Sequence, residues 1–532
     1  MRGADRVGPA RRSQPIGRRS LLGTGLALTV LLGGVTACGS DEPTSAPAPS
    51  SSIFTTPPSV YEEQRAEGVS ALLDSLTKAL TSGKRDQLDA LIDPLATRDF
   101  RDSLYQAQED LGPTPASSRA EPSQPTTSEP TSADRDAPDR GADDSAVATP
   151  SSRRPGASAT HSAPPPASRG GNLVLRTLDY RLAVNTGADR LIGGALGVKL
   201  SEAGSSDSWV SAVKLTYALG GTARPGVDEP VIELPQVLAF SRYGDEWKLL
   251  GDGSLAPDPD ADPDEPTRPP ELAPWAFGGL RAADVRTAGG TSAVLSYPGT
   301  DRTVTRVRRQ LTPAVAAVSD FWGDDWPRRA VVMTAGSEEQ FAGFTRTEPG
   351  TTKAAAAATV FSKIDRGARA VVGQRIVLSP AAGQLSESGV AVILRHELFH
   401  VATRIETAED APLWLVEGVA EYVGRRGSDA GVTDVAPDLA VQVASGRLPD
   451  ELPADSAFAV DNDTARLAYQ TAWSFAAFVA DRYDEERLRR MYLAVAQGGD
   501  TAATTKALEQ SLGADRDELI DQWRSWLRRE VR

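Results

Sequence analysis

Residues 395–400 read RHELFH, and this stretch carries two of the chain's three histidines. It lies in an apolar segment, roughly 388–404, that has the spacing of a helix. Histidines four residues apart share one helix face, about one turn from each other. Two such imidazoles can bind a zinc ion, and the glutamate between them can activate a water. We predict His396 and His400 as metal ligands and Glu397 as a general base; a histidine pair without a metal is the alternative.

A second helix is expected from Pro412 to about Gly424, where the glycine would end it. Catalytic zinc usually has three protein ligands and one open position. This half of the chain contains no further histidine or cysteine, so the third ligand must be a carboxylate. Glu417 is the best candidate, and Glu421 shares its face and could accept the ring N–H of a ligand histidine. A solvated face carrying both glutamates is the alternative.

Taken together, the two segments resemble the gluzincin metallopeptidases of the peptidase MA type. Residues 414–421, WLVEGVAE, are similar to the W-L-x-E-G-x-A-E signature of that group. The resemblance covers roughly residues 275–532 and implies that Glu417 binds zinc and that Glu421 orients a histidine. It also implies a thermolysin-like α+β domain, with a small mixed sheet and a mainly helical second half.

Strand and helix patterns in residues 271–532 agree with this architecture. Strands are expected at 291–297, 329–334, 359–362 and 375–379, and helices at 304–322, 388–404, 464–483 and 514–532. The resemblance implies that residues 374–379 form the sheet edge that pairs with an extended peptide; an internal strand is the alternative. It further implies an oxyanion-stabilising tyrosine on a later helix. Tyr469 is the candidate, with a core tyrosine as the alternative.

Residues 59–256 are expected to form a smaller α+β accessory domain. Helical periodicity in 59–111 precedes strand-like runs at 173–184, 209–217, 231–241 and 246–250, an order that resembles the nuclear-transport-factor-two type. Low-complexity composition predicts a disordered insertion at 112–170 and linkers at 39–58 and 257–270. The third histidine, His161, lies in that insertion and is not counted as a ligand.

The first 38 residues have the order of a bacterial export signal. Six arginines precede an apolar run at 21–32, which is too short to span a bilayer, where about 20 apolar residues are needed. Residues 35–38, VTAC, resemble a lipobox, which implies that Cys38, the only cysteine, is lipidated. Arg18 and Arg19 resemble a twin-arginine signal, with the general secretory route as the alternative. These features predict an anchor on the outer face of the cell membrane.

The net charge of −15 argues against nucleic-acid binding. We therefore predict a membrane-anchored, extracytoplasmic zinc metallopeptidase, a hydrolase with Zn²⁺ as cofactor. Its expected substrate is a peptide or protein of the cell envelope, and it is expected to act as a monomer. Two alternatives stay open: an envelope binding module that keeps a metal site without catalysis, and a hydrolase of a non-peptide amide in the cell wall.

Overall fold

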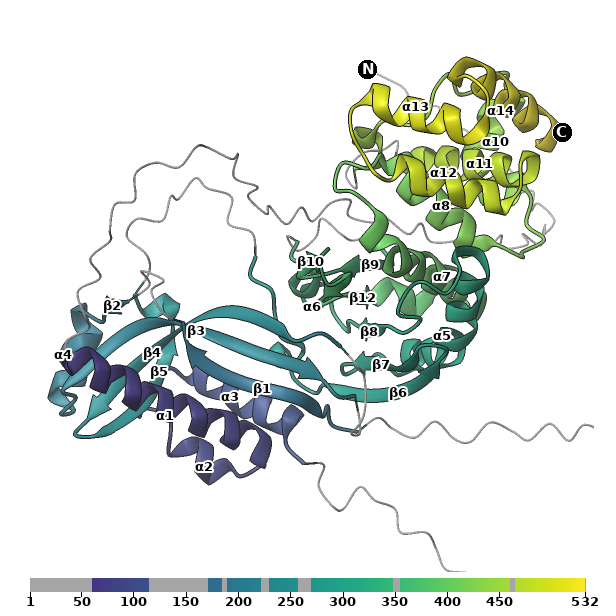
Figure 1. Cartoon of the computed structure of the whole chain (residues 1–532). Coiled ribbons are helices and arrows are strands. Elements are labelled where there is room, and N and C mark those ends of the chain that lie inside the picture. The colour runs from purple at the N-terminus through teal and green to yellow at the C-terminus, as the bar shows by residue number, and fades with distance from the viewer. Residues whose placement is uncertain are drawn as a thin grey trace, which may run out of the picture.

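The computed structural model describes residues 60–113, 171–183, 189–221, 229–256, 269–347, 355–459 and 465–531 (Figure 1). The predicted signal peptide with Cys38, the linker 39–58, and most of 112–170 and 257–270 lie outside these residues, as does His161. Within the described part of the chain, no helix combines the length and the apolar character needed to cross a lipid bilayer.

The N-terminal region is an antiparallel sheet with helices packed against it. Its helices are α1 (Val60–Ser82), α2 (Arg85–Asp89), α3 (Arg98–Leu111) and α4 (Gly194–Glu202). Its strands are β1 (Leu175–Leu182), β2 (Arg190–Leu191), β3 (Asp207–Leu219), β4 (Ile232–Tyr243) and β5 (Glu246–Asp252). The strand order is β1-β3-β4-β5, with β2 paired to β3. The predicted strands are confirmed, and in β3 the alternation buries Val213, Leu215 and Tyr217.

A second, mixed sheet carries the C-terminal region. Its strands are β6 (Arg281–Thr287), β7 (Gly290–Ser296), β8 (Val331–Thr334), β9 (Ala357–Val360) and β12 (Arg375–Leu378). Their order is β6-β7-β8-β12-β9, in which β7, β8 and β12 run parallel and β6 and β9 antiparallel to their neighbours. A hairpin of β10 (Lys363–Asp365) and β11 (Ala370–Val372) connects β9 to β12.

The prediction that residues 374–379 form the sheet edge is wrong. Strand β12 is internal, because Ile376 faces Val332 of β8 on one side and Thr359 of β9 on the other. All four residues of β12 are buried, as expected for a strand covered on both faces. Among the described strands, the edge on this side of the sheet is β9, which precedes β12 in the chain and runs antiparallel to it, and β6 forms the other edge.

Helices complete the C-terminal region and dominate its second half (Figure 1). Their bounds are α5 (Asp301–Trp322), α6 (Glu338–Thr345), α7 (Glu387–Thr403), α8 (Leu413–Arg425), α9 (Val432–Val435), α10 (Pro437–Ala444), α11 (Ala465–Arg482), α12 (Glu485–Val495), α13 (Thr501–Leu512) and α14 (Arg516–Glu530). Short 3₁₀ turns occupy Gly253–Leu255, Pro274–Ala276, Pro380–Gln384, Arg404–Glu406 and Asp455–Phe458. A small mixed sheet followed by a mainly helical half confirms the predicted fold class.

The two faces of the second sheet are covered differently. Helices α5 and α7 pack on one face, where Val332, Ile376 and Leu378 join their apolar side chains in one core. The other face belongs to a core that it shares with the N-terminal region, for example through Met333 and Val377. The N-terminal sheet and helices therefore cover the side of the second sheet that α5 and α7 leave open.

Two glycines let helix α8 lie close to its neighbours. A Cβ atom on Gly418 would lie 2.6 Å from the carbonyl oxygen of Ala472 in α11, and one on Gly424 would lie 3.0 Å from that of Val392 in α7. Gly424 does not end the helix as predicted, since α8 continues to Arg425. Its role is close packing, which brings α8 against the helix that carries the two histidines.

Candidate metal centre

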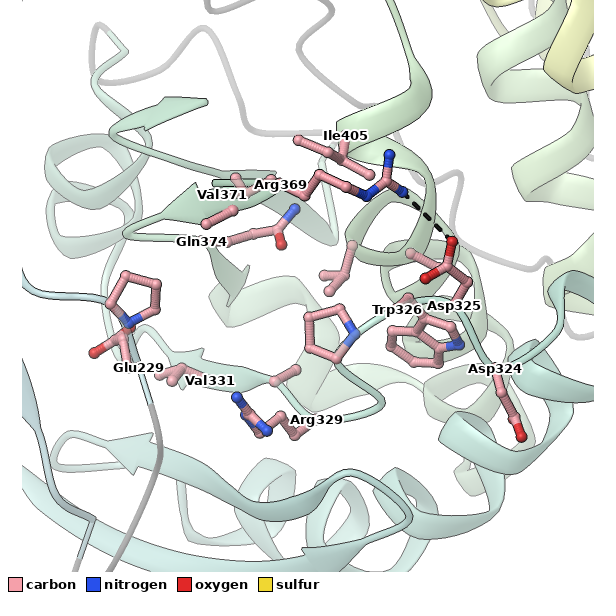
Figure 2. A pocket seen from close by; sticks show the side chains of 16 residues that line it. Glu229, Asp324, Asp325, Trp326, Arg329, Val331, Arg369, Val371, Gln374 and Ile405 are labelled. Atoms are coloured by element: carbon pink, nitrogen blue, oxygen red, sulfur yellow. Dashed lines mark hydrogen bonds and ion pairs between the residues drawn. The ribbon is translucent and has the colours of Figure 1, made fainter. Parts of the chain in front are cut away.

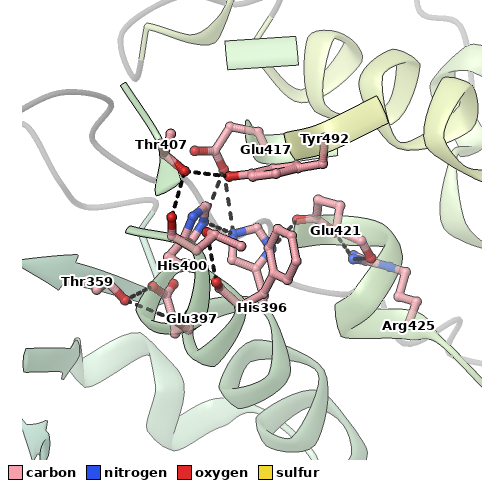
Figure 3. A network of polar contacts seen from close by, with 11 residues as sticks. Thr359, His396, Glu397, His400, Thr407, Glu417, Glu421, Arg425 and Tyr492 are labelled. Carbon is pink, nitrogen blue, oxygen red and sulfur yellow. Dashed lines mark hydrogen bonds and ion pairs between the residues drawn. The ribbon is translucent and has the colours of Figure 1, made fainter. Parts of the chain in front are cut away.

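Three predicted ligands meet at the contact of α7 and α8 (Figure 3). The Nε2 atoms of His396 and His400 are 3.1 Å apart, and Oε2 of Glu417 lies 3.5 Å from the first and 3.7 Å from the second. Tetrahedral zinc with bonds of about 2.0–2.1 Å separates two donors by about 3.3 Å. The spacing of these three atoms therefore suits one zinc ion.

Burial and missing hydrogen bonds also fit a metal at this point. His396 is 0% and Glu417 3% exposed, and Oε2 of Glu417 has no hydrogen-bond partner. An unpartnered buried carboxylate oxygen is costly unless a cation satisfies it. Burial lowers the pKa of His396 to about 4 and that of His400 well below its usual value, so both rings are neutral, the form that binds metal.

The position and the pKa of Glu397 both suit a proton acceptor. The hydroxyl of Thr359, on the edge strand β9, donates to Oε2 of Glu397 at 2.7 Å, while Oε1 is buried without a partner. Burial raises the pKa of Glu397 to about 7, against the opposing effects of His396 and Thr359. A carboxyl group that titrates near neutral pH suits general base catalysis. The sequence had placed Thr359 in a strand without giving it a role.

Glu421 lies next to the first histidine, one turn after Glu417. Its Oε1 is 3.6 Å from Nδ1 of His396, a nitrogen that has no other partner. Its Oε2 forms an ion pair with Arg425, which Figure 3 shows at the far side of the carboxylate. This arrangement fits the predicted orienting role. Arg425 was not singled out from the sequence, although its spacing of four from Glu421 was the available signal.

The candidate tyrosine lies in a small apolar cluster. Tyr469 is buried on α11, and its ring contacts that of Phe458 edge-on with the centroids 5.1 Å apart. Its role as oxyanion donor stays a prediction. Another tyrosine, Tyr492 of α12, is drawn beside Glu417 in Figure 3, and its hydroxyl lies 3.0 Å from that of Thr407.

A separate cavity of about 450 Å³ lies behind α7 (Figure 2). Val401 and Ala402 of that helix and Ile405 of the following 3₁₀ turn line it, and an ion pair of 3.4 Å between Arg369 and Asp325 lies at its rim. None of the predicted ligands contributes to its lining. The cavity is therefore distinct from the metal centre.

Comparison with known proteins locates one family in this chain. Residues 350–529 match the family model of the Peptidase MA superfamily. A search of curated proteins finds no match. The matched segment contains both motifs and all the residues of the metal centre.

Several solved structures show a weak likeness. An M1 zinc metallopeptidase from Deinococcus radiodurans bound to a Tyr-Ser-Ala substrate is 19% identical, with 48% of this chain and 52% of that chain covered and a TM-score of 0.30. Aminopeptidase A of Legionella pneumophila, in complex with aspartic acid, is 11% identical, with 67% and 35% covered and a TM-score of 0.30. The chain thus spans about half the length of the first of these structures. The part of the chain that holds the metal centre thus matches the Peptidase MA superfamily, and its set of two histidines and one glutamate suits zinc.

Proposed function

We propose that this chain is a zinc-dependent peptidase that hydrolyses peptide bonds outside the bacterial cell. The observation that carries the proposal is a set of three metal donors, two neutral imidazoles and the carboxylate of Glu417, with a second buried carboxylate, Glu397, on the same helix as the imidazoles. A purely structural zinc site needs no such base, because all of its coordination positions are filled by the protein. The unpartnered Oε1 of Glu397 therefore supports catalysis over a structural or relic site.

Bound zinc, Glu397, Thr359 and Glu421 would each have a separate role in hydrolysis. Bound zinc supplies a Lewis acid that polarises a carbonyl group and lowers the pKa of a water. Glu397 accepts one proton of the attacking water at Oε1, the hydroxyl joins the acyl carbon, and the carbon–nitrogen bond breaks. Glu397 then passes its proton to the leaving amine. Thr359 donates a hydrogen bond to the other oxygen of Glu397, and Glu421, 3.6 Å from Nδ1 of His396, would orient that ring.

Substrate binding is proposed at the edge strand β9. One side of β9 pairs with β12, and no strand among the described residues covers the other side. An extended peptide can add to such an edge through its backbone. Because Thr359 of β9 contacts Glu397, a peptide bound there would cross the metal centre.

The location is proposed from the N-terminal residues. Lipidation of Cys38 would attach the enzyme to the outer face of the cytoplasmic membrane, where envelope peptides and proteins are the available substrates. Metabolic labelling with a fatty-acid analogue tests this, since a Cys38→Ala variant should lose the label and leave the membrane fraction. Equal labelling of the variant would contradict the anchor and leave the peptidase proposal intact.

The deciding experiment compares zinc-loaded wild type with Glu397→Gln on a peptide library read by mass spectrometry. The variant should keep stoichiometric zinc and lose about 10²–10⁴-fold in cleavage rate. Glu387→Gln, in the exposed first turn of the same helix, is the matched control and should behave as wild type. Full cleavage by Glu397→Gln would refute the mechanism. If zinc-loaded wild type cleaves no peptide, a non-catalytic binding module is favoured. If it cleaves only non-peptide amides of the cell wall, a cell-wall amide hydrolase is favoured.

A further inference from the structure

Arg404 lies on the same stripe of helix α7 as the general base. Residues seven apart in a helix differ by about 20° around the axis and about 10 Å along it. Arg404 caps the helix with φ −50° and ψ −41°, so the helical geometry extends from Glu397 to Arg404. Helical side chains lean toward the N-terminus of their helix. The guanidinium of Arg404 therefore leans back toward the metal centre.

The Arg404 guanidinium forms no ion pair with any residue that the structure describes. Its guanidinium carbon lies over the ring of Phe361, 4.9 Å from the centroid, and its Nε is buried without a hydrogen-bond partner. Burial lowers its pKa, and the nearby Tyr492, Glu417 and Glu397 act in the opposite direction. Within the residues that the structure describes, its side chain forms no hydrogen bond and no ion pair.

Two other arginines near this helix show the contrast. Arg425 is paired with Glu421, and Arg369 lies 2.6 Å from Glu406. Glu397 and Glu417 are not available to Arg404, because one serves as the base and the other as a metal ligand. A partly buried guanidinium that lacks an acceptor favours an incoming anion, and a carboxylate matches its planar donors.

The place of Arg404 along a bound peptide follows from the edge strand. Phe361, on which Arg404 stacks, comes directly after β9, and Thr359 two residues earlier contacts Glu397. A peptide that adds antiparallel to β9 has its amino-terminal part at the carboxyl end of β9. With the cleaved bond at Glu397, the residue beside Arg404 lies on the amino side of that bond.

We propose that Arg404 binds the acidic side chain of the substrate residue immediately before the cleaved bond, so that the enzyme prefers aspartate or glutamate there. This inference rests on the proposed peptidase function and names the substrate class for the same site. An uncharged residue at that position would leave the Arg404 guanidinium without an acceptor. Substrates with an uncharged residue there should therefore be cleaved more slowly than substrates with an acidic one.

The test uses two synthetic peptides that differ only in Glu or Gln directly before the bond that zinc-loaded wild type cleaves. Wild type should favour the Glu peptide by about 10–100-fold in kcat/KM. Arg404→Met, which keeps the length of the side chain, should bring this ratio close to one, and Arg404→Lys should keep part of it. Arg366→Met removes a neighbouring exposed arginine and should leave the ratio unchanged.

The outcomes separate the two levels of the argument. A wild type that cleaves both peptides equally, or an Arg404→Met variant that keeps the wild-type ratio, would overturn the inference and leave the peptidase function standing. A wild type that cleaves no peptide would overturn the function and the inference with it. If Arg404→Met does not fold, the wild-type ratio must fall between low and high salt, because it depends on a partly screened charge; a salt-independent ratio would refute the inference.

Discussion

Two clusters of buried charged residues in the described part of the chain are organised in opposite ways. At the metal centre, three ligand atoms lie close enough together to hold one ion, and Oε2 of Glu417 and Oε1 of Glu397 have no hydrogen-bond partner among the described residues. At the junction of the two regions, Arg375 of β12 forms an ion pair with Glu229 of the N-terminal region, and the two side chains are each 6% exposed. The second oxygen of Glu229 accepts the backbone N–H of Leu219 at 3.3 Å.

The contrast shows how a buried charge can be assigned to structure or to function. Burial raises the pKa of Glu417 to about 8, against the effect of Arg404, so without a metal its neutral form is favoured. At the junction, burial lowers the pKa of Arg375, but Glu229, with Tyr217 and Glu271, more than offsets this and the pKa is raised, so the charged form persists. Similar burial thus favours the neutral form of Glu417 and leaves Arg375 charged, because only Arg375 has an oppositely charged side chain paired with it. Unpartnered groups in a cluster indicate a ligand site.

Removal of the third ligand should have the largest effect. Glu417→Ala is expected to weaken zinc binding by about 10³-fold or more, because three protein ligands become two. Peptide cleavage should fall with it, as measured by chelator competition and library cleavage on the same samples. Without metal, the variant should unfold at the same or a higher denaturant concentration than wild type, since an unpartnered buried carboxyl is lost. Zinc affinity within tenfold of wild type would remove Glu417 from the ligand set.

Removal of one partner at the junction should cost folding stability instead of zinc affinity. Arg375→Met leaves Glu229 buried and unpaired and should lower the free energy of unfolding by about 3–5 kcal/mol. The double variant Arg375→Met/Glu229→Leu should recover most of this loss, because no lone charge remains. Denaturant titration of the metal-free proteins measures both. Additive losses in the double variant would contradict a paired structural role.

The sequence predicted what depends on short spacing along one element. His396, Glu397 and His400 follow from helical periodicity, and Glu417 follows by elimination of other donors. Most strands of both sheets follow from alternation or from apolar runs, but β2 and the edge strand β6 were not predicted. The predicted histidine ligands and Glu417 do lie together in the structure, and the order of a small sheet followed by helices was expected correctly.

What the sequence missed depends on contacts between distant segments. Whether β9 or β12 forms the edge is decided by strand pairing across the sheet, which neither strand's own residues reveal. Gly424 was interpreted as a helix end because glycine commonly ends helices, whereas its close approach to Val392 of another helix could not be seen in the sequence. Thr359 reaches Glu397 across 38 residues, and Glu229 reaches Arg375 across 146, so neither contact has a local signature.

Loss of the orienting carboxylate should weaken the metal centre less than loss of a ligand. Glu421→Gln removes the charge beside Nδ1 of His396 and leaves Arg425 without its partner. We expect zinc affinity to fall by about 10–100-fold, the usual effect of such outer partners. Chelator competition at fixed pH measures it, beside Glu417→Ala. An effect as large as that of Glu417→Ala would mean that Glu421 is itself a ligand.

Asp110 provides the smallest and most discriminating case, because it shares features of both clusters. It lies buried on α3 at the junction of the two regions, and its Oδ2 has no hydrogen-bond partner, yet among the described residues it belongs to no group that could hold a metal. Burial raises its pKa to about 7, although Arg281 and the backbone of Leu280 and Gly279 oppose the shift. If a single buried oxygen without a hydrogen-bond partner were enough to indicate function, Asp110 would be part of a functional site. We expect instead that Asp110 affects only the pH dependence of folding stability.

The sign of that dependence follows from proton binding. Because the folded pKa is raised, the folded protein holds a proton on Asp110 that the unfolded chain releases between about pH 4 and pH 7. The contribution of Asp110 to stability is therefore complete below pH 4, falls as the pH rises to 7, and is constant above.

Asp110→Asn mimics the protonated form, so it should match wild type at pH 4 and be more stable by on the order of 1–2 kcal/mol at pH 8. Denaturant titrations at both pH values measure this, with Asp102→Asn on the exposed side of the same helix as control. If Asp110→Asn is less stable than wild type at pH 8, the ionised carboxylate of Asp110 has a specific stabilising partner. If the variant stays folded but loses peptide cleavage, an unpartnered buried oxygen can indicate function even outside a cluster of metal donors.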